Sequence, residues 1–248
     1  MHGHGHGAPV RTAEHVYPQW ISRRYMKHAS PRAFFSMDLG DHIGSRLART
    51  LNQTIKVCAD CNSGWMSQLE ASAQPVLAGL VEGKPMRLFR DDQHTAARWL
   101  VKNALMHELC VDEDQRVVTS KQVGQFREVG ILRGWSVHLA ASGDWLPTFV
   151  QHLGPVIRWA QDDGRPRGAA RFHTTKFDRL ISQVLVFDLD VTPTFDQILG
   201  GPDWSTQLWP PAHDSVQWPL SATFSEEYFE RVADVRLRSD QQDSPGGA

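Results

Sequence analysis

The segment that decides the fold is Val57–Glu70, with the sequence VCADCNSGWMSQLE. It holds two of the chain's three cysteines, Cys58 and Cys61, in a Cys-x-x-Cys pair that runs directly into Asn62. Proteins of reducing compartments rarely place cysteines at this spacing without a metal-binding or redox reason. The sequence LNQTIKV over residues 51–57 alternates enough to predict a strand. We therefore expect a strand, a Cys-x-x-Cys turn and a helix in succession.

The predicted helix begins at Asn62, because apolar residues then recur at three- and four-residue spacings along one face. Proline lacks a backbone N–H and clashes with the preceding turn, so Pro75 is expected to kink or split this helix. Gly83 and Pro85 are expected to end it.

A second informative segment lies upstream, in the sequence TAEHVYPQW over residues 12–20. Pro18 cannot continue a central strand, so Glu14 and His15 are expected at the end of a short strand. An acid beside a histidine is common by chance and is most often structural. The pair indicates a functional site only when it is considered together with the Cys-x-x-Cys segment.

Composition limits the class of protein. The 248 residues are 41% hydrophobic and 22% charged, which suits a globular chain with a sizeable core. No apolar run approaches the roughly 18 residues that span a bilayer, so we expect no membrane association. Three cysteines do not suit a disulfide scaffold, and a cytoplasmic location is expected.

Charge is distributed unevenly along the chain. The first 67 residues carry eight Lys and Arg against four acids, whereas the whole chain has a formal net charge of −2. A basic first quarter on an acidic remainder favours a polyanionic partner near the N-terminus. The alternative is an ordinary solvated charged surface.

The remaining chain predicts mixed secondary structure. Residues 21–48 are expected to be irregular, as are residues 200–219. Helices are expected over residues 91–110, 119–129 and 223–236, and strands over residues 135–140, 156–161, 169–174 and 181–189.

The two segments EHVYPQW and VCADCNSGWMSQLE together resemble the HNH endonuclease superfamily, which has the ββα-metal fold. More narrowly, they are similar to bacterial HNH-type proteins with EH-x-x-P-x-W and C-x-x-C-N-x-G-W-M-x-x-LE motifs. The resemblance covers residues 12–20 and 57–70. It implies an α+β protein with a small ββα-metal module over residues 1–84. The residues that follow predict a larger mixed α/β domain over residues 85–238, and the sequence SDQQDSPGGA predicts a disordered tail over residues 239–248.

The resemblance also implies roles for individual residues. His15 would be the general base that deprotonates the attacking water, since imidazole titrates near neutrality. Glu14 and Asn62 would ligate one divalent cation, Mg²⁺, Mn²⁺ or a similar ion. Asn52 is the candidate to orient His15, although Gln53 stands at the position where relatives have asparagine. Met66 replaces a third ligand of some relatives, and water would fill that position.

Cys58 and Cys61 would supply half of a structural Zn²⁺ site. Relatives have a second Cys-x-x-Cys upstream, where this chain has HGHGHG. Zinc accepts imidazole as well as thiolate, so two of His2, His4 and His6 could complete the site, with His4 and His6 preferred. The alternative is a zinc site that has been lost.

The function implied is metal-dependent hydrolysis of phosphodiester bonds in DNA, with RNA as the other nucleic acid to consider. The alternative is a catalytically inactive zinc-knuckle module that binds nucleic acid or protein. A thioredoxin-like role for the cysteine pair fits poorly, because no βαβ pattern precedes it.

Overall fold

A computed structural model describes residues 11–25, 33–38, 43–48, 53–113, 116–143, 149–160, 166–187 and 205–224. Within these ranges the protein is a mixed α+β structure of helices and mainly antiparallel sheets. Some predicted features lie outside the described residues. These are His2, His4, His6, Asn52, the tail over residues 239–248 and all but the first two residues of the helix predicted over residues 223–236.

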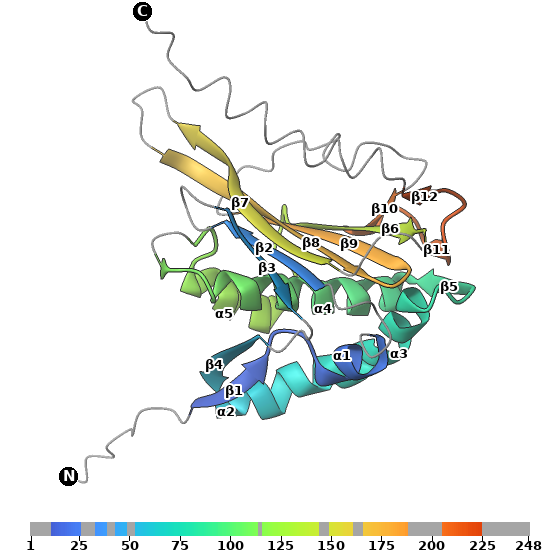
Figure 1. Cartoon of the computed structure of the whole chain (residues 1–248), viewed down its shortest axis with the longest axis horizontal. Helices are drawn as coiled ribbons and strands as arrows, with labels where there is room; N and C mark the ends of the chain where they lie inside the picture. The colour runs from blue at the N-terminus through green and yellow to red at the C-terminus, as the bar shows by residue number, and fades with distance from the viewer. Residues whose placement is uncertain are drawn as a thin grey trace, which may run out of the picture.

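The largest element in the described part of the chain is an eight-stranded sheet (Figure 1). Its strand order is β10-β6-β9-β8-β7-β2-β3, with β12 paired to β6. The β2–β7 and β12–β6 pairs are parallel, and the other pairs are antiparallel. The strands are β2 (Ala33–Asp38), β3 (Ile43–Ala48), β6 (Ser136–Ser142), β7 (Phe149–Ala160), β8 (Pro166–Phe177), β9 (Leu180–Phe187), β10 (Ser205–Trp209) and β12 (Thr223–Phe224).

The four strands predicted between residues 135 and 189 are confirmed as β6 to β9. Two expectations of irregular structure are wrong. Residues 21–48 contain β2 and β3, and residues 200–219 contain β10 and β11 (Ser215–Trp218). Strand β11 pairs with the distant β5 (Met86–Phe89). Strands β2, β10 and β11 pair with β7, β6 and β5, which lie far along the chain, so their weak local patterns did not reveal them. Strand β3 pairs with its neighbour β2.

Helix α4 (Arg90–Glu108) lies between the sheet and α3 (Ser67–Val81), and α5 (Ser120–Val129) lies beside it (Figure 1). The Asp92 side chain accepts from the Phe89 N–H and caps α4, and Thr119 caps α5. Both helices agree with their predicted ranges. Because α3 and the sheet cover α4 from two sides, five of its polar residues are buried with its apolar ones; they are Gln93, Lys102, Asn103, His107 and Glu108.

The N-terminal elements lie on the far side of α4 from the sheet (Figure 1). Strand β1 (Arg11–His15) pairs antiparallel with β4 (Thr54–Cys58), and α1 (Gln19–Tyr25) follows β1. After β4 the chain passes through α2 (Ala59–Cys61) and a π-helical turn, η1 (Asn62–Met66), into α3. The predicted order of strand, Cys-x-x-Cys turn and helix is therefore confirmed.

Helix α3 is not split at Pro75, because it runs unbroken from Ser67 to Val81. The irregularity lies earlier, at Gly64, whose φ of −95° and ψ of −112° are not helical. The predicted end of the helix is confirmed, since Gly83 follows it with a φ of 64°.

One hydrophobic core contains residues from both sides of residue 84, the position predicted to divide the two domains. It includes Tyr17 and Leu69 on one side and Trp99 and Val184 on the other. Strands β2 and β7, which lie on opposite sides of the same position, share one sheet. No helix in the described part of the chain is long and apolar enough to cross a membrane.

Candidate functional site

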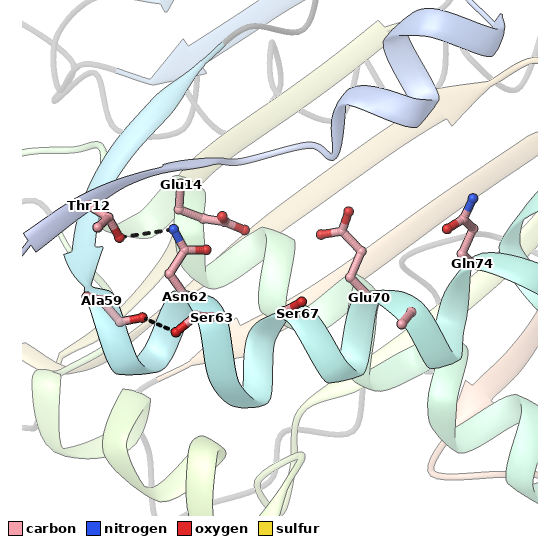
Figure 2. Close-up of a pocket in the computed structure, with 9 residues that line it drawn as sticks. Thr12, Glu14, Ala59, Asn62, Ser63, Ser67, Glu70 and Gln74 are labelled. Atoms are coloured by element: carbon pink, nitrogen blue, oxygen red, sulfur yellow. Dashed lines mark hydrogen bonds between the residues drawn. The ribbon is translucent and has the colours of Figure 1, made fainter.

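A pocket of about 540 Å³ opens between β1 and the helical segment that follows the cysteines (Figure 2). Its wall is mostly polar and comes from two segments nearly fifty residues apart in the sequence. The residues that line it are Thr12, Glu14, Ala59, Asn62, Ser63, Ser67, Glu70, Ala71 and Gln74.

Strand alternation decides which residues of β1 reach this pocket. Successive side chains on a strand point to opposite faces. Thr12 and Glu14 therefore share the pocket face, whereas Arg11, Ala13 and His15 lie on the other face. This geometry separates the two members of the Glu14–His15 pair.

Asn62 joins the helical segment to β1. Its Nδ2 atom donates to Thr12 Oγ1 at 3.1 Å and to the Ala13 carbonyl oxygen at 3.3 Å. These bonds fix the amide, and Figure 2 shows Oδ1 on the side that faces the Glu14 carboxylate. Two oxygen donors predicted to serve one cation are thus brought to the same pocket.

A buried lysine lies behind Glu14. Lys102 Nζ, from α4, lies 3.2 Å from Glu14 Oε1, and its side chain is 0% exposed against 13% for that of Glu14. Burying an ammonium costs several kcal/mol unless an anion compensates it. Glu14 supplies that anion, so this carboxylate is held from the protein side and is open to a ligand on the pocket side.

Glu70 is a second carboxylate in the pocket, two helical turns beyond Asn62. Figure 2 shows it on the same side of α3 as Asn62, with its carboxylate directed into the space beside Glu14. Burial raises the pKa of the Glu70 carboxyl, the Lys102 ammonium lowers it, and the Glu14 carboxylate raises it. The three charged groups therefore form one electrostatic unit.

His15 does not line the pocket. Its neighbour Gln19 accepts from Arg23 through Oε1, which turns the Gln19 amide nitrogen toward His15, with the two Nε2 atoms 3.2 Å apart. An amide nitrogen only donates, so His15 Nε2 is the acceptor of this hydrogen bond.

The face of the β1–β4 ribbon that carries His15 is basic. Arg11, Ala13 and His15 alternate along β1 and therefore share one face. Lys56 of β4 lies directly opposite Ala13 in the register, so its side chain is on that face too. Arg11 and Lys56 are exposed. Exposed cations beside an imidazole attract phosphate groups.

Cys58 and Cys61 are joined by a disulfide in the structure, with their Cα atoms 5.2 Å apart. Cys58 Sγ also accepts from the Cys61 N–H at 3.0 Å, so this residue caps α2. Thiolates, not a disulfide, ligate zinc. The predicted zinc site therefore applies to the reduced protein and stays a prediction.

The donor set of the pocket suits a hard cation. Glu14, Glu70 and the Asn62 carbonyl offer oxygen, which Mg²⁺ and Mn²⁺ prefer. Within the described ranges, no three His, Cys, Asp or Glu side chains cluster closely enough to hold a metal. Sites for Mg²⁺ commonly use one or two carboxylates and complete the shell with water and substrate phosphate. Met66 is buried in the core and does not line the pocket.

Two residues of the site were not predicted from sequence. Glu70 ends the quoted segment, and its place two helical turns after Asn62 was a usable signal. Lys102 gave a weaker signal: it is a lysine within the mostly apolar sequence WLVKNALM over residues 99–106. Its contact with Glu14 spans 88 positions.

Comparisons with protein-family models, with curated proteins and with solved structures found no match for this chain.

Proposed function

We propose that this protein is a metal-dependent endonuclease of the HNH type that hydrolyses phosphodiester bonds in DNA. The observation that carries the proposal is the Asn62 bridge. The Asn62 amide binds Thr12 and Ala13 of β1 and leaves its oxygen beside Glu14. A ββα arrangement of β1, β4 and the following helix would create this meeting of a strand carboxylate and a helix amide.

In this proposal Glu14 and Asn62 would hold one divalent cation. When bound, such a cation stabilises the extra negative charge that develops on a phosphate during hydrolysis. His15 Nε2, which accepts from Gln19, would take the proton of the attacking water once a water replaces that amide. Glu14 and His15 are consecutive at the end of β1, with their side chains on opposite faces of the strand. Arg11 and Lys56 would hold flanking phosphates.

Nicking of supercoiled plasmid with Mg²⁺ or Mn²⁺, and with EDTA as the metal-free control, tests this proposal. Wild type should nick, whereas Glu14→Gln and His15→Ala should lose at least about 100-fold in rate, which is the scale of general-base catalysis. The matched control is His213→Ala, which removes an exposed histidine that does not line the pocket. Equal rates for wild type and His15→Ala would exclude His15 as the base.

The second candidate is a non-catalytic module that binds nucleic acid. The position of His15 outside the pocket lining favours it. Binding of DNA without nicking under any of these metal conditions would support this candidate over the enzyme.

A further inference from the structure

A buried cation, Lys102, pairs with one carboxylate of the pocket without lining the pocket itself. Lys102 is fully buried, lies 3.2 Å from Glu14 Oε1, and is not among the residues that line the pocket. Its position on α4 places it beneath Glu14, on the side away from the open space. It therefore acts on the pocket through Glu14 and not by touching what binds there.

Charge counting gives the consequence of this arrangement. With both carboxylates ionised, Glu14 and Glu70 contribute two negative charges and Lys102 one positive charge. The unit then has a net charge of −1. The same unit without the lysine would have a net charge of −2, which attracts a divalent cation far more strongly at these separations.

We propose that Lys102 is the positioning residue of this pocket. Its ammonium fixes one oxygen of Glu14, presents the other oxygen to the cation and keeps the resting pocket at a net charge of −1. Cation binding to the free protein is therefore weak, and a substrate phosphate completes the site. This inference rests on the proposed function, since it assigns Lys102 to the same cation site.

The first prediction of this proposal is a split between binding and turnover. At pH 8, Lys102→Met should bind Mn²⁺ about tenfold more tightly or better, because the ammonium no longer repels the ion. At saturating Mn²⁺ the same variant should nick plasmid about 10- to 100-fold more slowly, because Glu14 is no longer held. A lysine with a merely structural role would not tighten Mn²⁺ binding.

Mn²⁺ titrations followed by electron paramagnetic resonance measure the affinity without any need for activity. The matched control is Lys84→Met, which removes a 63%-exposed lysine paired with Glu82 at 2.5 Å; its Mn²⁺ affinity should equal that of wild type. A second variant, Glu70→Gln, should weaken Mn²⁺ binding about tenfold, because it lowers the negative charge of the pocket. Glu70 is only partly buried, so this variant serves if Lys102→Met does not fold.

The outcomes separate the two proposals. If wild type binds Mn²⁺ but Lys102→Met binds it no more tightly, the role of Lys102 is overturned and the cation site stands. If Glu70→Gln leaves the affinity unchanged, the charge count is overturned. If wild type binds no Mn²⁺ with or without DNA, the proposed function fails and the role of Lys102 fails with it.

A double-mutant cycle tests the ion pair itself, whatever the protein does. Lys102→Met and Glu14→Gln should each lower the unfolding midpoint, because each leaves a charge or a polar group without its partner. The double variant should lose less than the sum of the two. Additive losses would show that the pair is not coupled and would overturn the positioning role.

Discussion

Tyr17 Oη lies 2.7 Å from His173 Nε2, and this hydrogen bond joins the segment after β1 to the middle of β8. Both side chains are buried, and the Tyr17 ring also packs against His107 of α4 and Phe177. Tyr17 therefore connects the segment that follows Glu14 to the large sheet through a hydrogen bond and ring packing.

The first prediction concerns this bond. Tyr17→Phe keeps the ring but removes the hydroxyl, so it should lower the free energy of unfolding by about 1–3 kcal/mol, the cost of a lost buried hydrogen bond. Urea denaturation measures the loss. Tyr25→Phe is the control, because the Tyr25 hydroxyl donates to Glu82 at a partly exposed site; its loss should be smaller. If Tyr17→Phe and Tyr25→Phe lower the free energy of unfolding equally, the buried Tyr17–His173 hydrogen bond contributes no more than the partly exposed one.

The two ends of the Asn62 amide should have different roles: the nitrogen binds β1, and the oxygen is the proposed cation ligand. Asn62→Asp keeps an oxygen toward the pocket but loses the donor to the Ala13 carbonyl, whereas Asn62→Leu loses both. We expect Asn62→Asp to retain Mn²⁺ binding and Asn62→Leu to bind about 10- to 100-fold more weakly. Calorimetric titration with Mn²⁺ compares them. Loss of binding in both variants would mean that only the amide geometry matters.

The basic face of the β1–β4 ribbon should set the salt dependence of DNA binding. Replacing Arg11 or Lys56 with glutamine should weaken binding and reduce the slope of log K against log salt by about 0.9 for each phosphate that the variant no longer neutralises. Fluorescence anisotropy at several salt concentrations measures this slope. Arg90→Gln is the control, since Arg90 is an exposed arginine paired with Asp214. A slope that Arg11 and Lys56 leave unchanged would place the DNA elsewhere.

His138 should make the protein sensitive to acid. Burial lowers the pKa of this imidazole below its usual 6.5. The unfolded chain then binds more protons than the folded chain as the pH falls below about 6.5, so the stability contributed at neutral pH is lost there. His138→Gln should lose less stability between pH 7.5 and pH 5.5 than wild type, in thermal unfolding followed by circular dichroism. An exposed control, His213→Gln, should follow wild type.

Thiol labelling can measure whether Cys58 and Cys61 form a disulfide in the protein. With Cys58 and Cys61 joined, alkylation of the denatured, unreduced protein should label one thiol, Cys110, and reduction should raise the count to three. Intact mass measures both. In the native protein Cys110 should react slowly, because burial raises the pKa of its thiol. Three labels before reduction would show the dithiol form, in which zinc analysis with His4→Ala and His6→Ala then tests the zinc prediction.

Local chemistry made several parts of the fold predictable. Thr119 marks the start of α5 and Gly83 follows the end of α3, because caps and left-handed glycines act within one helical turn. The helix is not split at Pro75, and non-helical backbone angles occur earlier in this segment, at Gly64. Strands β10 and β11 were missed because their partners, β6 and β5, are far along the chain.

The sequence by itself placed Glu14 at the end of a strand and Asn62 at the start of a helix, because strand alternation and helical spacing are short-range patterns. Only the tertiary structure decided that Asn62 would bind Thr12 and that Lys102 would lie behind Glu14. Helix α4 brings that lysine across 88 positions, and no local pattern encodes such a contact. The physical reason is burial: once the layers close over Lys102, its charge needs a carboxylate, and Glu14 is the described residue that hydrogen-bonds it.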